Sequence, residues 1–271
     1  MKTARAMTIA GSDCSGGAGI QADLKTFQAF GVYGSSVITS VLAENTVKFS
    51  NLQAVSTQLV SEQIECCLDD IGADAVKTGM LYSAEIVRAV AEKLREHKVK
   101  HLVVDPVLSA TVGGSLLDRD GLDVMRKELL PLAEIVTPNM EEAGKLAGLT
   151  IRTDIDLREA GETIGKMGPG LVVITGGDDS NSSSDLCIDW AWDGKSWEIF
   201  DSPRVAGPSP HGTGCTFSAA ITALLALGSK PEDAVRGAKD YLYAQIKSAP
   251  GLGKGPTPLN HSVRVDTGGD L

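Results

Sequence analysis

The chain lacks the long apolar run that a membrane-spanning helix needs. Its longest apolar stretch runs from Ala219 to Leu227 with Thr222 interrupting it, about half of the ~20 residues that cross a bilayer. The apolar run near the N-terminus ends at Gly11, which is too short for the core of a signal peptide. We therefore expect no membrane span and a cytoplasmic protein.

The chain is also poor in basic residues and in metal-binding patterns. It has 25 Lys and Arg against 35 Asp and Glu, a net charge of −10, and no basic run that could follow a phosphate backbone. Its 5 cysteines are an odd number without Cys-x-x-Cys spacing, and its 4 histidines are scattered. These features argue against a nucleic-acid partner, a disulfide framework and a structural zinc site.

What is present is an ordinary globular composition over 271 residues, with 42% hydrophobic and 22% charged residues. Short Val- and Ile-rich runs alternate with segments of helical period, which predicts an α/β fold with a mainly parallel sheet. The predicted strands are Met7–Ala10, Ser36–Leu42, Ala75–Lys77, His101–Asp105, Glu134–Thr137, Leu171–Thr175, Leu186–Trp190 and Glu198–Phe200. The predicted helices are Ile20–Phe30, Leu59–Ile71, Ala84–Glu96, Arg119–Leu130, Met140–Leu146, Leu157–Lys166, Gly214–Leu227 and Pro231–Lys247.

Neither an internal repeat nor a linker divides the chain, so we expect one domain over residues 1–271. Ser229 and Glu232 predict a capping box at the start of the last helix. The polar residues 176–184 predict a surface loop, and the Gly- and Pro-rich residues 251–271 an irregular tail.

The first glycine-rich segment, Gly11–Gly19, follows the first predicted strand and precedes a helix. Small residues there let a ligand approach the backbone closely. Its end, Gly17–Ala22, also fits a dinucleotide-binding pattern with Glu44 as the ribose partner. That pattern needs its first glycine at the strand end, whereas six residues, 11–16, separate Gly17 from the predicted strand. A dehydrogenase is therefore the weaker interpretation.

The second glycine-rich segment, His211–Thr216, leads into an apolar helix. Unpaired N–H groups and the helix dipole at such a start can hold an anion, although a plain tight turn has the same sequence pattern. Cys215 fits either a small buried residue or a reactive thiol. A helix N-terminus lowers the pKa of a thiol, which favours the reactive interpretation.

Asp105 and Glu142 both follow predicted strands, at the sheet edge where ligands of open α/β sheets bind. Glu142 has an alternative role, because Asn139 at the N-cap with Glu142 three residues later makes a capping box. Two carboxylates near an anion-binding turn are the groups that magnesium-dependent phosphoryl transfer requires.

Together these segments carry a resemblance that runs in order from about residue 6 to about residue 261. They are Ala6–Asp13, Ser15–Thr26, Lys77–Leu81, Val104–Val107, Thr137–Asn139 with Glu142, and His211–Thr216. The chain resembles the hydroxymethylpyrimidine/phosphomethylpyrimidine kinase family of thiamine biosynthesis. That resemblance implies a ribokinase-like three-layer α/β/α sandwich that uses ATP and Mg²⁺ to phosphorylate the pyrimidine alcohol and then its monophosphate. We also expect a homodimer.

The resemblance assigns roles to residues by position. It implies that the pyrimidine lies near Gly11, Ala18, Glu44, Met80 and Val107, with Asp23 close by. It places Asp105, Glu142 and Asn139 by the magnesium-bound phosphates, and Thr175, Gly177 and His211 by the nucleotide. It makes Gly212, Thr213 and Gly214 the anion hole, and puts Cys215 where ribokinase-like sugar kinases usually have an aspartate base.

The chain departs from the family pattern at two positions. Glu44 stands where many members have glutamine, and an ionised glutamate can only accept hydrogen bonds. Either the bound ring is protonated, Glu44 is protonated, or the ligand differs. Thr175 stands where the family commonly has a lysine that could neutralise ATP phosphates. Either turnover is slower, another cation substitutes, or the nucleotide is bound differently.

Three hypotheses follow. The first is a pyrimidine kinase, with a pyridoxal-type kinase as its nearest alternative because that ring also carries a hydroxymethyl group. The second is a ligand-binding member with weakened catalysis, suggested by the missing lysine. The third is a dehydrogenase, and consumption of ATP with each alcohol would exclude it.

Overall fold

A single nine-stranded sheet runs through the part of the chain that the structure, a computed structural model, describes: residues 3–109, 117–177, 185–207 and 209–263. Its strands are β1 (Arg5–Asp13), β2 (Tyr33–Asn45), β3 (Lys48–Ala54), β4 (Ala75–Thr78), β5 (Leu102–Val104), β6 (Ile135–Val136), β7 (Leu171–Ile174), β8 (Leu186–Trp192) and β9 (Trp197–Pro203). The order across the sheet is β3-β2-β1-β4-β5-β6-β7-β8-β9. From β2 to β7 every neighbouring pair is parallel, and β3, β8 and β9 add antiparallel edges.

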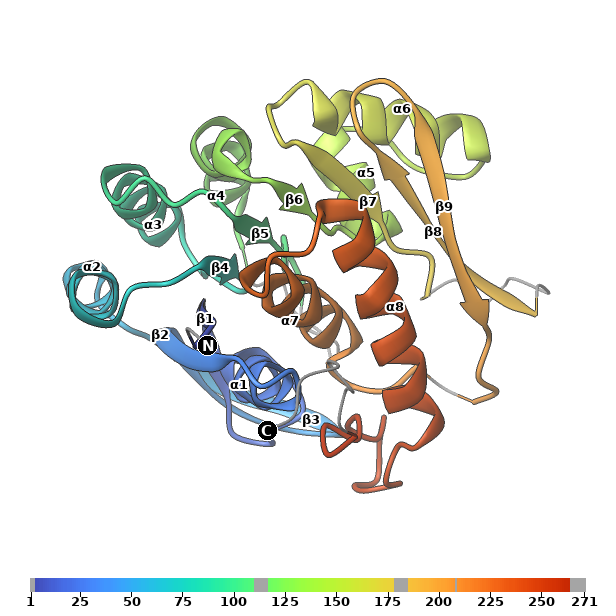
Figure 1. Cartoon of the computed structure of the whole chain (residues 1–271), viewed down its shortest axis with the longest axis horizontal. Helices are drawn as coiled ribbons and strands as arrows, with labels where there is room; N and C mark the ends of the chain where they lie inside the picture. Colours follow the sequence, from blue (N-terminus) through green and yellow to red (C-terminus); the bar gives the residue numbers. More distant parts are fainter. Residues whose placement is uncertain (1–2, 110–116, 178–184, 208, 264–271) are drawn as a thin grey trace.

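Helices cover both faces of the sheet, which gives the predicted three layers (Figure 1). The helices are α1 (Gly19–Ala29), α2 (Thr57–Cys66), α3 (Ala84–Glu96), α4 (Arg119–Val124), α5 (Met140–Ala147), α6 (Asp154–Gly165), α7 (Thr213–Ala226) and α8 (Pro231–Lys247). One core cluster joins α1, α7 and α8 to the sheet, and another joins the remaining helices to the opposite face. The predicted α/β/α sandwich is therefore confirmed.

The burial pattern explains why these segments form these elements. All four residues of β7 are buried, as expected for a central strand covered on both faces. In α3, Ile86, Val90 and Leu94 recur at helical spacing and are buried, while the opposite face carries charges. The longer helix α7 is apolar nearly all round because it packs between the sheet and both α1 and α8. No helix of the described residues is both long and apolar enough to cross a membrane.

The structure corrects several predicted elements. β3 was not predicted, because this edge strand is largely polar and exposed and only Phe49, Leu52 and Ala54 among its residues are partly buried. The predicted helices at residues 59–71 and 119–130 each end in a turn of different pitch, at Cys67–Ile71 and Met125–Leu129. Ser229 does not cap α8. The N-cap is Lys230, without a side-chain hydrogen bond, and Pro231 begins the helix.

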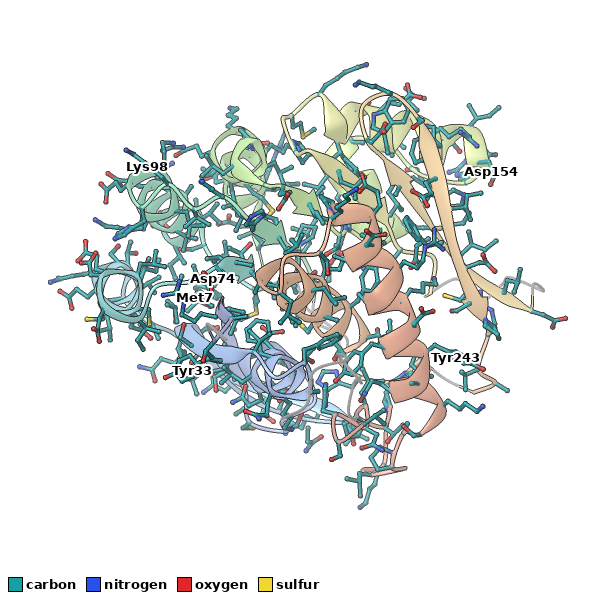
Figure 2. All side chains as sticks on the ribbon, viewed as in Figure 1. Met7, Tyr33, Asp74, Lys98, Asp154 and Tyr243 are labelled. Atoms are coloured by element: carbon teal, nitrogen blue, oxygen red, sulfur yellow. The ribbon has the colours of Figure 1, made fainter. Side chains whose placement is uncertain are left out.

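Two predicted irregular segments are only partly covered. The polar loop at residues 176–184 falls mostly on residues 178–184, outside the described residues. The described part of the tail, up to Val263, has no helix or strand, and an isolated bridge joins Pro258 to His211. Lys98, in the turn after α3, and Asp154, at the start of α6, lie in the layer opposite α7 and α8 (Figure 2).

Candidate active site

A cavity of about 770 Å³ opens at the carboxyl ends of the parallel strands, where ligands of open α/β sheets bind. β1 contributes Gly11 and Asp13, β2 contributes Glu44, and Asp105 follows directly after β5. The first turn of α7 forms another wall. The parallel strand order thus brings together residues that are far apart in the sequence.

One end of the cavity suits a small flat ring. Met80, Val107 and Leu42 form an apolar cluster there, and Gly11 and Ala18 line the same cavity. A Cβ atom at Gly11 would lie 2.7 Å from Met80 Cε and 2.9 Å from Ser40 Oγ, so any side chain would force these neighbours apart. The predicted pyrimidine residues Gly11, Ala18, Glu44, Met80 and Val107 therefore all line one cavity.

Asp23 does not line this cavity, so its predicted place close to the pyrimidine does not include direct contact. Its carboxylate is fully buried, accepts a hydrogen bond of 2.6 Å from Thr8 Oγ1, and lies 2.7 Å from Lys77 Nζ. Burial raises the pKa of Asp23, and the Lys77 charge opposes that rise. Burial alone would lower the pKa of Lys77, but the charges of Asp23 and Asp105 raise it above its usual value. Asp23 thus balances a buried ammonium beneath the site.

His211 lies at the ring end of the cavity, not with the predicted nucleotide residues. Its Nε2 is 3.1 Å from Asp13 Oδ2, and Glu44 is their neighbour. The hydrogen bond to Asp13 raises the pKa of His211 despite burial. A bridge to Pro258 holds His211 beside the glycine-rich turn after β1, and its predicted contact with the nucleotide stays a prediction.

The start of α7 has the geometry of an anion site. Gly212 is its N-cap with φ of 87°, in the left-handed region, and α7 begins at Thr213. A Cβ at Gly212 would lie 1.9 Å from the carbonyl oxygen of Gly17, so only glycine fits. The first N–H groups of a helix have no partner within it, and here Thr213, Gly214 and Cys215 line the cavity.

Cys215 is not the thiolate that the helix N-terminus predicts. Burial raises the pKa of its thiol to about 12, and the charges of Asp105 and Asp23 add to the rise. Lys77 and the Gly19 N–H act in the opposite direction but do not offset burial. The thiol is therefore neutral at pH 7, and the expectation of a poised base is wrong for the ligand-free protein.

Two carboxylates, Asp105 and Glu142, line the same cavity as the start of α7. Asp105 is 5% exposed, and its Oδ2 accepts a hydrogen bond of 3.0 Å from Ser218 Oγ. Burial raises its pKa, and Lys77, 3.9 Å away, opposes that rise. A Cβ at Gly214 would lie 4.0 Å from Asp105 Oδ2, so this carboxylate is next to the anion site.

Glu142 has the predicted capping-box role and also lines the cavity, while its place at magnesium-bound phosphates stays a prediction. It forms a capping box with Asn139, whose backbone N–H donates to Glu142 Oε2 at 3.0 Å and whose side chain accepts from the Glu142 N–H. The same residue lines the cavity together with Asp105. One or two carboxylates completed by substrate phosphates are the usual magnesium environment, so this donor set fits Mg²⁺.

The other end of the cavity contains a buried cation that the sequence did not single out. Thr175 and Gly177 line this end, and so does Lys239 from α8. Lys239 Nζ is 2.7 Å from Asp189 Oδ2, and Asp189 Oδ1 accepts the Gly176 N–H at 3.1 Å. Tyr243, on α8 in Figure 2, also lines the cavity. The sequence offered one signal for this site, because Lys239 falls on the face of the predicted helix Pro231–Lys247 that carries the buried residues.

Comparisons with known proteins agree with this geometry. The sequence profile described as phosphomethylpyrimidine kinase matches residues 13–260. This chain belongs to that family. A hydroxymethylpyrimidine/phosphomethylpyrimidine kinase of Haemophilus influenzae is 44% identical over 257 residues, covering 94% of this chain and 95% of the relative. The thiamine biosynthesis bifunctional protein ThiED of Geobacter sulfurreducens is also 44% identical, and the match spans 96% of this chain and only 52% of that longer protein.

Solved structures related to this family member have the same fold. Pyridoxal kinase from Bacillus subtilis, solved as an ADP complex, has a TM-score of 0.88 at 38% identity, covering 97% of this chain and 98% of the other. Phosphomethylpyrimidine kinase from Clostridium difficile has a TM-score of 0.78 at 39% identity, covering 90% and 99%. Because the chain belongs to a kinase family, the interpretation of Gly17–Ala22 as the dinucleotide-binding turn of a dehydrogenase has no support.

Proposed function

We propose that this chain transfers the γ-phosphoryl group of ATP to the hydroxymethyl group of 4-amino-5-hydroxymethyl-2-methylpyrimidine, and then phosphorylates the monophosphate in thiamine biosynthesis. One observation carries the proposal: a single cavity joins a ring-sized apolar wall at Met80 and Val107 to the anion-binding start of α7. The names of the related kinases support this choice of acceptor.

The residues of the cavity divide the work between holding the ring and holding the phosphoryl group. The apolar wall fixes the ring so that its alcohol oxygen can attack the γ-phosphorus while the bond to the β-phosphate breaks, ADP leaves and the hydroxyl proton passes to solvent. Backbone N–H groups of Thr213 and Gly214 face the charge that develops on the phosphoryl oxygens. In the second step the attacking monophosphate, whose second pKa is about 6, is already largely ionised at pH 7.

Asp105 and Glu142 would hold Mg²⁺, which supplies charge neutralisation on the ATP phosphates when bound. Asn139 keeps Glu142 oriented through the capping box. Thr175 and Gly177 would contact the nucleotide, and Lys239 takes the place of the lysine absent at Thr175. The burial of Lys239 at that end of the cavity supports this role.

A pyridoxal-type kinase is the second candidate, because the B. subtilis pyridoxal kinase has a TM-score of 0.88 against this chain. A coupled ADP-release assay with hydroxymethylpyrimidine, its monophosphate and pyridoxal separates the candidates by kcat/KM. We expect the pyrimidines to be preferred. Preference for pyridoxal would establish the second candidate, and binding without turnover would indicate a ligand-binding protein with weakened catalysis.

We further propose a single cytoplasmic domain that acts as a homodimer on small molecules and not on nucleic acid or membranes. The net charge of −10 supports the exclusion of nucleic acid. Light scattering coupled to size-exclusion chromatography tests the dimer, and a mass of one chain would contradict it.

A further inference from the structure

Three titratable side chains from distant segments meet at the ring end of the cavity. Asp13 ends β1, Glu44 lies near the end of β2, and His211 precedes α7, yet one side-chain atom from each lies within 4.8 Å of the others. All three line the cavity. Asp13 and His211 are buried, and Glu44 is half-buried.

Asp13 is fixed as an anion by its surroundings. Its Oδ1 accepts the Ser15 N–H at 2.7 Å, and its Oδ2 accepts the Ser15 hydroxyl at 2.8 Å and the Ala18 N–H at 2.9 Å. Burial opposes ionisation, but these donors and His211 lower its pKa to about 2. Because an ionised Asp13 can only accept, His211 Nε2 must be the donor in their 3.1 Å contact.

With Asp13 fixed as an anion, Glu44 and His211 are the members of the cluster whose protons can vary, because His211 can donate from Nε2 in its neutral and in its charged form. The titratable groups that face its carboxyl are Asp13 from β1 and His211 from the segment before α7. Cys14 donates its thiol hydrogen to the Glu44 backbone carbonyl, and β3 places the apolar Phe49 opposite. Burial, the fixed charge of Asp13 and a hydrogen bond with the Asp13 carboxylate raise the pKa of Glu44, while the charge of His211 acts in the opposite direction.

We propose that Glu44 recognises the amidine edge of an aminopyrimidine, the ring nitrogen and its neighbouring amino group, as a pair that shares one proton taken from solvent. In one form the carboxylic acid donates to the ring nitrogen and its carbonyl oxygen accepts from the amino group. In the other, the carboxylate accepts from the protonated ring and from the amino group, a charge-assisted pair. Both forms contain the same atoms and the same single proton.

This arrangement makes ligand binding consume a proton. Above the pKa values of the free ring and of free Glu44, neither partner carries the proton that the complex needs. A neutral glutamine amide would donate and accept without it. The ligand class is thus a nitrogen heterocycle with an amidine edge, and the inference rests on the proposed function in naming a pyrimidine.

The test is calorimetric titration of the complete chain with hydroxymethylpyrimidine between pH 6 and pH 9, in buffers of different ionisation enthalpy. We expect uptake approaching one proton per site at the alkaline end, where Kd should rise about tenfold per pH unit. Glu44→Gln should abolish the uptake and flatten the Kd curve, so that the variant binds more tightly than the wild type at high pH. Glu62→Gln, which removes an exposed carboxylate outside the cavity, should behave as the wild type.

Two results would overturn the inference alone. Binding by the wild type without proton uptake, or uptake that persists in Glu44→Gln, would show that Glu44 does not share a proton with the ring, while leaving the proposed kinase function intact. Absence of pyrimidine binding at every pH, by contrast, would overturn the inference and the proposed function together.

Discussion

Replacing Cys215 with alanine separates two accounts of phosphoryl transfer. With a pKa of about 12, roughly one thiol in 10⁴ is ionised at pH 8, and forming the thiolate costs about 5 kcal/mol. General-base catalysis accelerates a reaction by a factor of roughly 10²–10⁴, and a factor of 10⁴ corresponds to about 5 kcal/mol. The cost of forming the thiolate therefore cancels even the largest gain from general-base catalysis. We therefore expect Cys215→Ala to slow both phosphorylation steps by less than about tenfold, about 1.4 kcal/mol, as loss of a neutral neighbour would.

Single-turnover kinetics with the pyrimidine alcohol and with its monophosphate measure the two steps separately. Cys66→Ala is the matched control, because Cys66 is exposed and lies outside the cavity. A loss of 10²–10⁴ confined to the alcohol step would refute the reasoning. It would mean that bound substrate and nucleotide lower the thiol pKa enough for Cys215 to act as the base.

Three further perturbations test other parts of the site. Asp105→Asn and Glu142→Gln should each lower kcat and raise the Mg²⁺ concentration needed for half-maximal rate. The melting temperature of Glu142→Gln should stay close to that of the wild type, because glutamine also closes a capping box. An unchanged Mg²⁺ titration would mean that Glu142 is only a helix cap. The pKa of Asp13 is lowered from 3.8 to about 2, which contributes about 2 kcal/mol of stability that is present above pH 4 and lost as pH falls toward 2. Denaturant titrations of the wild type should show this loss in the free energy of unfolding. The same dependence of the unfolding free energy on pH in Asp13→Asn would contradict the assignment. Removing the buried pair with Lys239→Met and Asp189→Asn together should raise KM for ATP and keep KM for the pyrimidine, whereas equal changes in both would place Lys239 outside nucleotide binding.

The layers and the site edge were predictable because they follow from local patterns. Buried Val- and Ile-rich runs alternating with helical segments determine a parallel sheet, and residues directly after its strands must share one edge. Asp105 and Glu142 could be assigned to the cavity on this argument alone. The glycines at 11 and 212 were predictable for a related reason, since each stands at a strand end or a helix start.

The electrostatic details could not be predicted, because they depend on which side chains meet in three dimensions. Asp23 pairs with Lys77, 54 residues away in the sequence, and that pairing withdraws it from the ligand. The helix N-terminus predicts a lower thiol pKa for Cys215, but the depth of burial, which no local pattern encodes, reverses the sign. His211 reaches Asp13 across 198 residues, so its place at the ring end could not be inferred from its own segment.

The most direct test of the proposed function follows the products of one reaction by mass spectrometry. The wild-type chain is incubated with hydroxymethylpyrimidine, Mg²⁺ and excess ATP, and the alcohol, monophosphate and diphosphate are quantified over time. The account predicts that the monophosphate appears first and then declines as the diphosphate accumulates, with one ADP formed at each step. Pyrimidine that binds but stays unphosphorylated would contradict it.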